Sequence, residues 1–295
     1  MTRIDCLRIG GSALRWLSAN LRHFGLPAID DPEESTTIGK RRKAFGELAI
    51  ATMVAQRSPR LRRSPEYARV LEHLTSAARQ PDFSFDMLRR PGLFPFYAGV
   101  FGALKACGQE LPAVQKRIAR MLEFGFLDAV ERTPRAKIDL KYLLDLGGFS
   151  HLLPAYADLY RGSIAQHLPP VVYLRRDDIY DLTHIIFHVA DFGRDSLGAV
   201  LADRLEATRD YVSLLLATRV VERDWDLVGE LLLCCRCLSD GARPPVAGAW
   251  RALESAQAVS GYVSGPESKA GGEFAKHYHP TLVALLASAA EDGAA

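Results

Sequence analysis

The chain has 295 residues, of which 48% are hydrophobic and 24% charged, and its formal net charge is +2. A dedicated nucleic-acid-binding protein concentrates a stronger positive excess, so this balance argues against nucleic acid as a partner. No uncharged apolar run reaches the roughly 18 residues of a membrane span, and the start MTRIDCLRIGG lacks the apolar stretch of a secretory signal. Five cysteines without regular spacing favour a reducing compartment. We therefore expect a cytoplasmic protein that does not associate with membranes.

Helical periodicity dominates the sequence, and the expected helices in chain order are approximately 11–24, 40–57, 65–79, 96–107, 111–129, 138–147, 150–161, 178–192, 195–219, 224–239, 245–258 and 281–291. Ser64-Pro65 and Asp195-Ser196 carry the signals of helix starts. Segments 25–38 and 260–277 are predicted to be loops, and the second, rich in Gly and Ser, is a candidate flap beside a site. Val171–Leu174 is the one plausible strand.

The connections between these helices are mostly short, which favours antiparallel neighbours. We predict a single all-α domain spanning 1–295, built from antiparallel helix pairs and arranged as an α/α toroid or an α-solenoid. The sequence shows no clear repeat of the known helical-repeat lengths that would separate the two arrangements.

The most informative segment is 177–191, DDIYDLTHIIFHVAD. At 100° per residue, one arc of this helix, roughly 80° wide, carries only Asp and His side chains, while the opposite side is apolar. These arc residues are Asp177, Asp181, His184, His188 and Asp191. An ordinary solvated face carries Lys, Glu, Arg or Gln. An arc of Asp and His side chains is typical of metal ligation and of proton transfer near neutral pH.

His184 and His188 stand at positions i and i+4, so both imidazoles project from one face and can bind one metal ion. Asp191, a turn further on, is expected either to join them as a ligand or to orient an imidazole. A second segment must complete the site, and His277-Tyr278-His279 is the best donor. Pro280 disfavours helical geometry before it, so we expect this pair in an extended lead-in to the last helix. The ligand set would be His184, His188, Asp191, His277 and His279, holding zinc or iron.

Two other groups of residues suggest substrate binding. Asp177-Asp178-x-x-Asp181 has the DDxxD spacing with which class I terpenoid cyclases hold magnesium and diphosphate, although the second motif of those enzymes is not matched. Asp139 and Tyr142, three residues apart on a helix after Pro134, could face a cavity or form a charged outer face.

The combination Y-D-L-T-H-x-x-F-x-x-x-D-F-G, here Tyr180 to Gly193, resembles the signature of an uncharacterised bacterial family of actinobacterial type. Asp139-Leu-Lys-Tyr-x-Leu-Asp145 and Tyr278-His279-Pro-Thr are similar to other patterns of that family. The resemblance covers a chain of about this length and implies a place in specialised-metabolite gene clusters. It emphasises Thr183, His184, Asp191, Tyr278 and His279, and it places an aromatic residue where this chain has His188.

These observations favour an enzyme that acts on a small molecule or a carrier-bound intermediate. His184 and His279 would bind a metal or serve as acid and base, with Asp191 and Tyr278 beside them. One alternative is a helical-repeat interaction protein that binds a peptide or a partner enzyme, and another is a magnesium-dependent, cyclase-like enzyme. The enzyme hypothesis predicts that the Asp/His arc faces inward and meets the 277–279 segment. The interaction hypothesis predicts that the arc is open to solvent.

Overall fold

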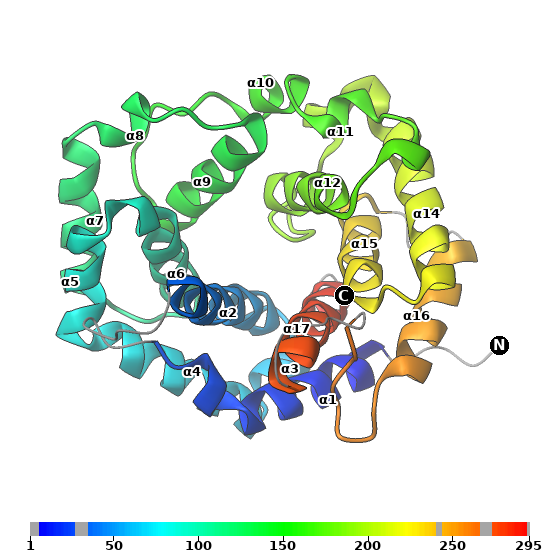
Figure 1. The fold of residues 1–295 in the computed structure, drawn as a ribbon, viewed down its shortest axis with the longest axis horizontal. Helices are drawn as coiled ribbons and strands as arrows, with labels where there is room; N and C mark the ends of the chain where they lie inside the picture. The colour runs from blue at the N-terminus through cyan, green and yellow to red at the C-terminus, as the bar shows by residue number, and fades with distance from the viewer. Residues whose placement is uncertain (1–5, 27–34, 240–243, 266–272, 294–295) are drawn as a thin grey trace.

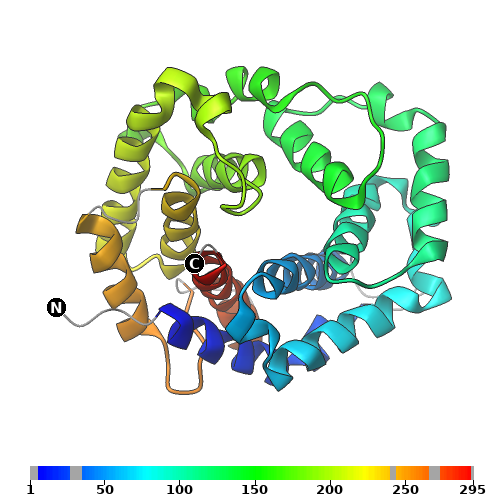
Figure 2. The ribbon, with the colours of Figure 1, turned by 180° about the vertical axis from the view of Figure 1, so that it is seen from behind.

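A computed structural model of the chain describes residues 6–26, 35–239, 244–265 and 273–293. The helices form two concentric rings, as Figure 1 shows along the ring axis and Figure 2 from behind. The inner ring consists of α2 (Ser35–Gln56), α6 (Phe94–Ala106), α9 (Pro134–Gly147), α12 (Arg176–Val189), α15 (Trp225–Cys237) and α17 (Glu273–Asp292).

The outer ring covers these helices. Its longer members are α1 (Cys6–Ala19), α4 (Pro65–Arg79), α5 (Pro81–Arg89), α7 (Pro112–Glu123), α10 (Tyr156–Arg161), α14 (Leu205–Glu222) and α16 (Pro244–Ala256). Short elements connect them: η1 (Leu21–Phe24), α3 (Pro59–Arg62), η2 (Pro91–Leu93), α8 (Phe126–Ala129), α11 (Ile164–His167), η3 (Val171–Tyr173), α13 (Gly198–Leu201) and η4 (Ala202–Arg204).

The inner ring is closed. Each inner helix contacts the next along the chain, and the last, α17, returns to pack on α2 and on α1. The all-α prediction is therefore confirmed, and the closure makes the arrangement a toroid rather than an open solenoid. No helix in the described residues is long and apolar enough to cross a membrane.

Local signals explain several of the helix starts. Ser64 caps α4 by accepting a hydrogen bond from the Tyr67 N–H at 3.1 Å, and Pro65 follows at the first helical position, as predicted. Thr133 caps α9 in the same way through the Ala136 N–H at 3.3 Å. Caps of this kind set where a helix begins, and in α9 they set the position of its polar side chains.

Several predicted bounds are wrong. Helix α2 begins at Ser35, inside the predicted loop 25–38, and residues 27–34 of that loop lie outside the described residues. Within the predicted helix 150–161, only Tyr156–Arg161 is helical, because Gly148 ends α9 in a left-handed cap and Pro154 follows. The candidate strand is the 3₁₀ turn η3. Of the candidate flap, residues 266–272 lie outside the described part.

The predicted helix 195–219 is also divided. Asp195-Ser196 does not start a long helix, because Ala202 has a φ of +46° and separates the short α13 from α14. A non-glycine residue at positive φ cannot continue a right-handed helix. The long helix of this region therefore begins only at Leu205.

The largest correction concerns His277-Tyr278-His279, which lies inside α17 and not in an extended lead-in. Pro280 has no N–H with which to bond the carbonyl of Lys276, four residues earlier. That carbonyl instead accepts the N–H of Gly265 at 2.9 Å, so the helix continues through the proline and the carbonyl keeps a partner. Three consecutive helical residues point about 100° apart, so His277, Tyr278 and His279 face different surroundings.

Helices α15 and α17 cross closely at Gly229. A Cβ atom at this position would lie 2.6 Å from the Cγ2 atom of Val283. Because a side chain would force the two helices apart, the glycine permits a close approach that brings Glu230 of α15 beside His279 of α17.

Candidate active site

A cavity of about 290 Å³ occupies the centre of the inner ring, and all six inner helices contribute to its wall. Most of the wall is apolar and includes Ile50, Phe96, Val100 and Leu286. The polar and charged side chains that line it are Glu47, Arg135, Asp139, His184, His188, Glu230 and His279. A mostly apolar cavity with a few converging polar groups is the usual form of a small-molecule site.

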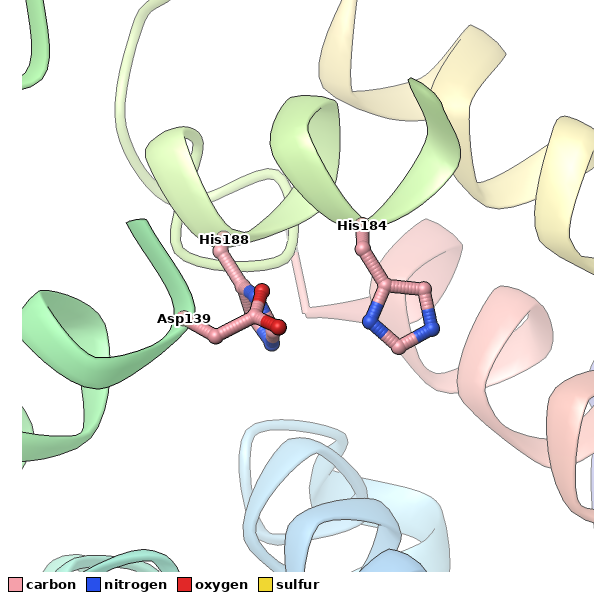
Figure 3. Close-up of side chains that lie close together, drawn as sticks. All are labelled: Asp139, His184 and His188. Atoms are coloured by element: carbon pink, nitrogen blue, oxygen red, sulfur yellow. The ribbon is translucent and has the colours of Figure 1, made fainter. Parts of the chain in front are cut away.

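Helix α12 places His184 and His188 on one face, because residues four apart lie one turn apart on the same side. Figure 3 shows both rings pointing from α12 to the same side, with Asp139 of α9 next to His188. One ligand atom from each of Asp139, His184 and His188 lies within 4.8 Å of the others. Leu182, Ile185 and Ile186, on the other faces of α12, are buried in the core.

Asp139 holds His188 in a defined orientation. Its Oδ1 lies 2.7 Å from His188 Nδ1, and the His188 ring stacks on Tyr142 with ring centroids 4.8 Å apart. A carboxylate only accepts, so Nδ1 carries a proton, and whenever the ring is neutral its lone pair is on Nε2. Burial alone would raise the pKa of Asp139, but the neighbouring imidazole of His188 outweighs it and the pKa is lowered.

His184 has a different environment. The Arg135 guanidinium lies 3.0 Å from its Nδ1. Arginine only donates, so Nδ1 accepts and Nε2 carries the proton. Burial lowers the pKa of His184 well below its ordinary value, so the ring is neutral at pH 7. Arg135 also lies 3.1 Å from Asp139 and 3.5 Å from Asp181.

A second imidazole of the cavity wall, His279, is also paired with a carboxylate. His279 Nδ1 is 2.8 Å from Asp226 Oδ1, and its Nε2 is 3.5 Å from Glu47 and 4.0 Å from Glu230. Burial disfavours the charged ring, but Asp226, Glu47 and Glu230 outweigh burial and raise the pKa of His279 to about 9. His279 is therefore a buried imidazolium at neutral pH.

Asp226 is itself fixed by two further donors. Its Oδ2 accepts from Arg176 at 2.8 Å and from the Tyr180 hydroxyl. Burial would raise the pKa of Asp226, but His279, Tyr180 and Arg176 together lower it to about 2. Asp226 therefore stays ionised and holds the His279 ring through Nδ1.

Glu230 is 3% exposed, and its carboxyl accepts a hydrogen bond from the hydroxyl of Thr183 on α12. Burial, with a contribution from the charge of Asp226, raises the pKa of Glu230 to about 8. At neutral pH this side chain is mainly the neutral acid. His279 and Glu230 thus stand side by side in unusual protonation states, which is typical of acid–base sites.

The carboxylates of the DDxxD motif do not converge. Asp177 is exposed, and Asp178 accepts from the backbone N–H of Arg175 at 2.8 Å, which caps α12. Asp181 pairs with Arg135 at the edge of the site. Only Asp181 therefore contacts a side chain of the cavity wall, and the other two lie at the start of the helix.

The expected role of Asp191 needs correction. Helix α12 ends at Val189, and Asp191, Phe192 and Gly193 have φ angles of +43°, +53° and +87°, so Asp191 leaves the arc. Its carboxylate accepts from Arg57 at 2.7 Å and from the Tyr142 hydroxyl at 2.8 Å. Asp191 touches the site only through Tyr142, which stacks on His188. The carboxylates that orient imidazoles of the cavity wall are Asp139 and Asp226.

The segment 277–279 contributes one residue to the cavity wall, His279. The His277 ring stacks on Tyr262, with centroids 4.2 Å apart. Tyr278 packs against Phe24 and Phe274, and burial together with the nearby charge of Glu47 raises its pKa. Tyr142 is 4% exposed and supports His188 without lining the cavity.

Four residues of the site were not among those expected from the sequence: Glu47, Arg135, Asp226 and Glu230. For two of these residues the amino-acid sequence does contain a recognisable pattern. Glu47 and Glu230 are each the one charged residue in a long apolar run, FGELAIATMVA and LVGELLLCC respectively. A lone carboxyl inside such a run is costly to bury, so it marks a paired or functional group.

A family model described as a domain of unknown function (DUF6895) matches residues 10–289. The chain belongs to this family. The match includes every residue of the cavity wall, so the site lies within the family's domain. No curated protein and no solved structure matches the chain.

Proposed function

We propose that the protein is an enzyme that performs acid–base chemistry on a small molecule, or on the small-molecule end of a carrier-bound intermediate, inside the central cavity. One observation carries the proposal. Two imidazoles, His188 and His279, face the same apolar cavity, and each is oriented through Nδ1 by a carboxylate.

His188 is the base in this proposal. With its Nδ1 proton held by Asp139, the lone pair of Nε2 is the atom available to accept a proton from a substrate. His184, neutral and four residues away, contributes an Nε2–H that can donate a hydrogen bond to the same molecule.

His279 is the acid. It is protonated at neutral pH, and its Nε2–H lies beside Glu47 and Glu230 at the cavity wall. Glu230 offers a second proton, because its carboxyl is mainly neutral at pH 7. A base and an acid on different helices of one cavity wall suit reactions in which one atom loses a proton and another atom gains one.

Two further parts of the proposal rest on the sequence. The resemblance of Tyr180–Gly193 suggests a role in bacterial specialised metabolism. The buried thiols of Cys107, Cys234 and Cys237, which form no disulfide, fit the reducing cytoplasm.

A bound zinc or iron ion is the second candidate, favoured by the proximity of ligand atoms from Asp139, His184 and His188. Two imidazoles and a carboxylate suit either metal, which would activate a bound water or polarise a carbonyl. Arg135 opposes this arrangement, since its cation contacts both Asp139 and His184. Metal binding would require Arg135 to move, for example fully onto Asp181.

An interaction surface and a magnesium–diphosphate site have less support. The interaction hypothesis places the Asp/His arc in solvent and away from His279, yet His184 and His188 line the same cavity as His279. A magnesium–diphosphate site is disfavoured, because Asp177 and Asp178 lie outside the cavity wall.

The activity is tested by incubating the protein with a small-molecule extract and comparing the products by mass spectrometry. Wild type should consume at least one compound that His188→Gln and His279→Gln leave unchanged. The exposed His167 in α11 provides a matched control, and His167→Gln should behave as wild type. Identical profiles for wild type and both cavity variants would contradict the proposal.

The metal content of the purified protein distinguishes the metal-free acid–base enzyme from the zinc or iron enzyme. We expect purified wild type to hold less than stoichiometric zinc or iron, and we expect Arg135→Gln to bind zinc more tightly by about tenfold, because it removes the competing cation. Inductively coupled plasma mass spectrometry and zinc titration measure both. If wild type holds stoichiometric metal, and His184→Ala and His188→Ala lose it, the metalloenzyme is the correct proposal and the metal-free enzyme is not.

A further inference from the structure

Carboxyl side chains, including the mainly protonated Glu230, outnumber the cationic groups in and around the cavity. The carboxyl side chains are Glu47, Asp139, Asp181, Asp224, Asp226 and Glu230, whereas the cationic groups paired with them inside the ring are Arg135, Arg176 and His279. Lys43 also approaches Glu47, at 3.6 Å, but its side chain is 63% exposed and its charge is well solvated. An apolar cavity with an excess of carboxyl groups attracts a cation.

Two of these carboxyl groups, Glu47 and Glu230, lie near His279. The Oε2 atom of Glu47 is shut off from solvent and accepts no hydrogen bond from the described residues. Its Oε1 lies 3.5 Å from His279 Nε2. A buried carboxylate oxygen without a donor costs about 1–3 kcal/mol or more. A ligand that donates a hydrogen bond to Oε2 would remove this cost.

Glu230 is the second carboxyl group near His279. Its side chain is 4% exposed, and its Oε1 is 4.0 Å from His279 Nε2, beyond hydrogen-bond distance. Because burial is the main reason that the Glu230 carboxyl keeps its proton, a positive charge placed beside it would favour its ionisation. The Glu47 and Glu230 side chains together can then surround one cationic group.

The rest of the wall sets the shape of the ligand. The apolar part of the wall includes Ile50, Phe96, Val100, Leu143 and Leu286, together with the rings of Phe187 and Phe192. Aromatic faces attract organic cations, whereas a bare inorganic cation needs several oxygen ligands. The volume of about 290 Å³ would hold roughly ten water molecules of about 30 Å³ each. This space suits a small molecule.

We propose that the part of the cavity near His279 binds the ammonium group of a small organic cation with an apolar body, through Glu47 together with Glu230. The inference names the substrate class of the site described under the proposed function and rests on that function for its biological meaning. The ammonium would donate to Glu47 Oε2, and the apolar body would lie along the wall toward His184 and His188.

The test compares three probes with the same six-carbon body: hexylammonium, hexanol and hexanoate. Isothermal titration calorimetry at pH 7.5 in 0.15 M salt should give at least tenfold tighter binding for hexylammonium than for hexanol, and the weakest binding for hexanoate. Glu47→Gln should weaken hexylammonium binding at least tenfold and leave hexanol binding within twofold. Retained hexanol binding shows that the variant keeps its cavity. Glu72→Gln, an exposed glutamate of α4, should change nothing.

Three results would overturn the inference: no hexylammonium binding at millimolar concentration, hexanol or hexanoate binding as tightly as hexylammonium, or unchanged hexylammonium binding by Glu47→Gln. These results are separable from failure of the proposed function. Binding is measured without turnover, so ammonium selectivity with no consumed compound would remove the enzyme proposal alone. Turnover without ammonium selectivity would remove this inference alone.

Discussion

Replacing Asp226 by alanine is expected to lower the free energy of unfolding by about 3–5 kcal/mol, the usual cost of removing one partner from a buried ion pair. Asp226 is 8% exposed and accepts from His279, Arg176 and Tyr180. Its removal leaves the buried His279 imidazolium with weaker partners, since Glu47 and Glu230 lie at 3.5 Å and 4.0 Å. Urea denaturation at pH 7, with the m-value checked, measures the change.

The isosteric Asp226→Asn separates charge from shape. It can still accept from Tyr180, but it no longer holds a negative charge beside His279, so the pKa of His279 should fall toward its ordinary value. Nuclear magnetic resonance of the His279 ring would report that shift. Asp158→Ala is the control, because Asp158 pairs with Arg161 at the surface of α10, where such pairs contribute up to about 1 kcal/mol. A loss below about 1 kcal/mol for Asp226→Ala would contradict the buried pair described here.

The second large effect is a loss of stability on the alkaline side. The pKa of His279 is raised from 6.5 to about 9 and that of Glu230 from 4.5 to about 8. In both cases the folded state binds the proton more tightly than the unfolded state. The contribution of His279 is therefore complete below pH 6.5 and disappears as the pH rises through 9. The contribution of Glu230 is complete below pH 4.5 and disappears as the pH rises through 8.

From pH 7 to 8 both groups act in the same direction, and from pH 8 to 9 mainly His279 does, so the free energy of unfolding should fall as the pH rises. The slope is up to about 1.4 kcal/mol per pH unit for each proton. Asp226 acts in the opposite sense only in acid, because its contribution is present above pH 3.8 and is lost as the pH falls through about 2. Urea midpoints at half-unit intervals from pH 7 to 9 measure the slope.

Two variants show how much of this pH dependence of the free energy of unfolding comes from Glu230 and how much from His279. Glu230→Gln should flatten the profile mainly below pH 8, and His279→Gln should flatten it up to pH 9. Glu72→Gln, at an exposed position of α4, should leave it unchanged. If the free energy of unfolding of wild type does not change between pH 7 and 9, His279 and Glu230 have the same pKa in the folded and the unfolded chain, which would contradict the prediction.

The sequence by itself determined those features that depend on near neighbours along the chain. Periodicity showed that the chain is helical, and the i, i+4 spacing placed His184 and His188 on one face of α12. The Ser64-Pro65 start of α4 was recognisable because a cap and its N–H lie three residues apart. His279 was chosen as a partner of the α12 face from its residue type alone. His184, His188 and His279 all line the cavity.

The tertiary structure alone decided which carboxyl groups serve these histidines. Asp139 is 49 residues from His188 and Asp226 is 53 residues from His279, so no local spacing relates them. Each pair depends on which inner helices become neighbours when α17 closes the ring on α2. Remote contacts also decide two local conformations. At Pro280, the N–H of Gly265 replaces the hydrogen bond that proline cannot make. At Asp191, Arg57 of the α2–α3 connection holds the backbone in a left-handed turn. Periodicity describes the face of a single helix, whereas the partner of a buried charge is set by the packing of helices that are remote in sequence.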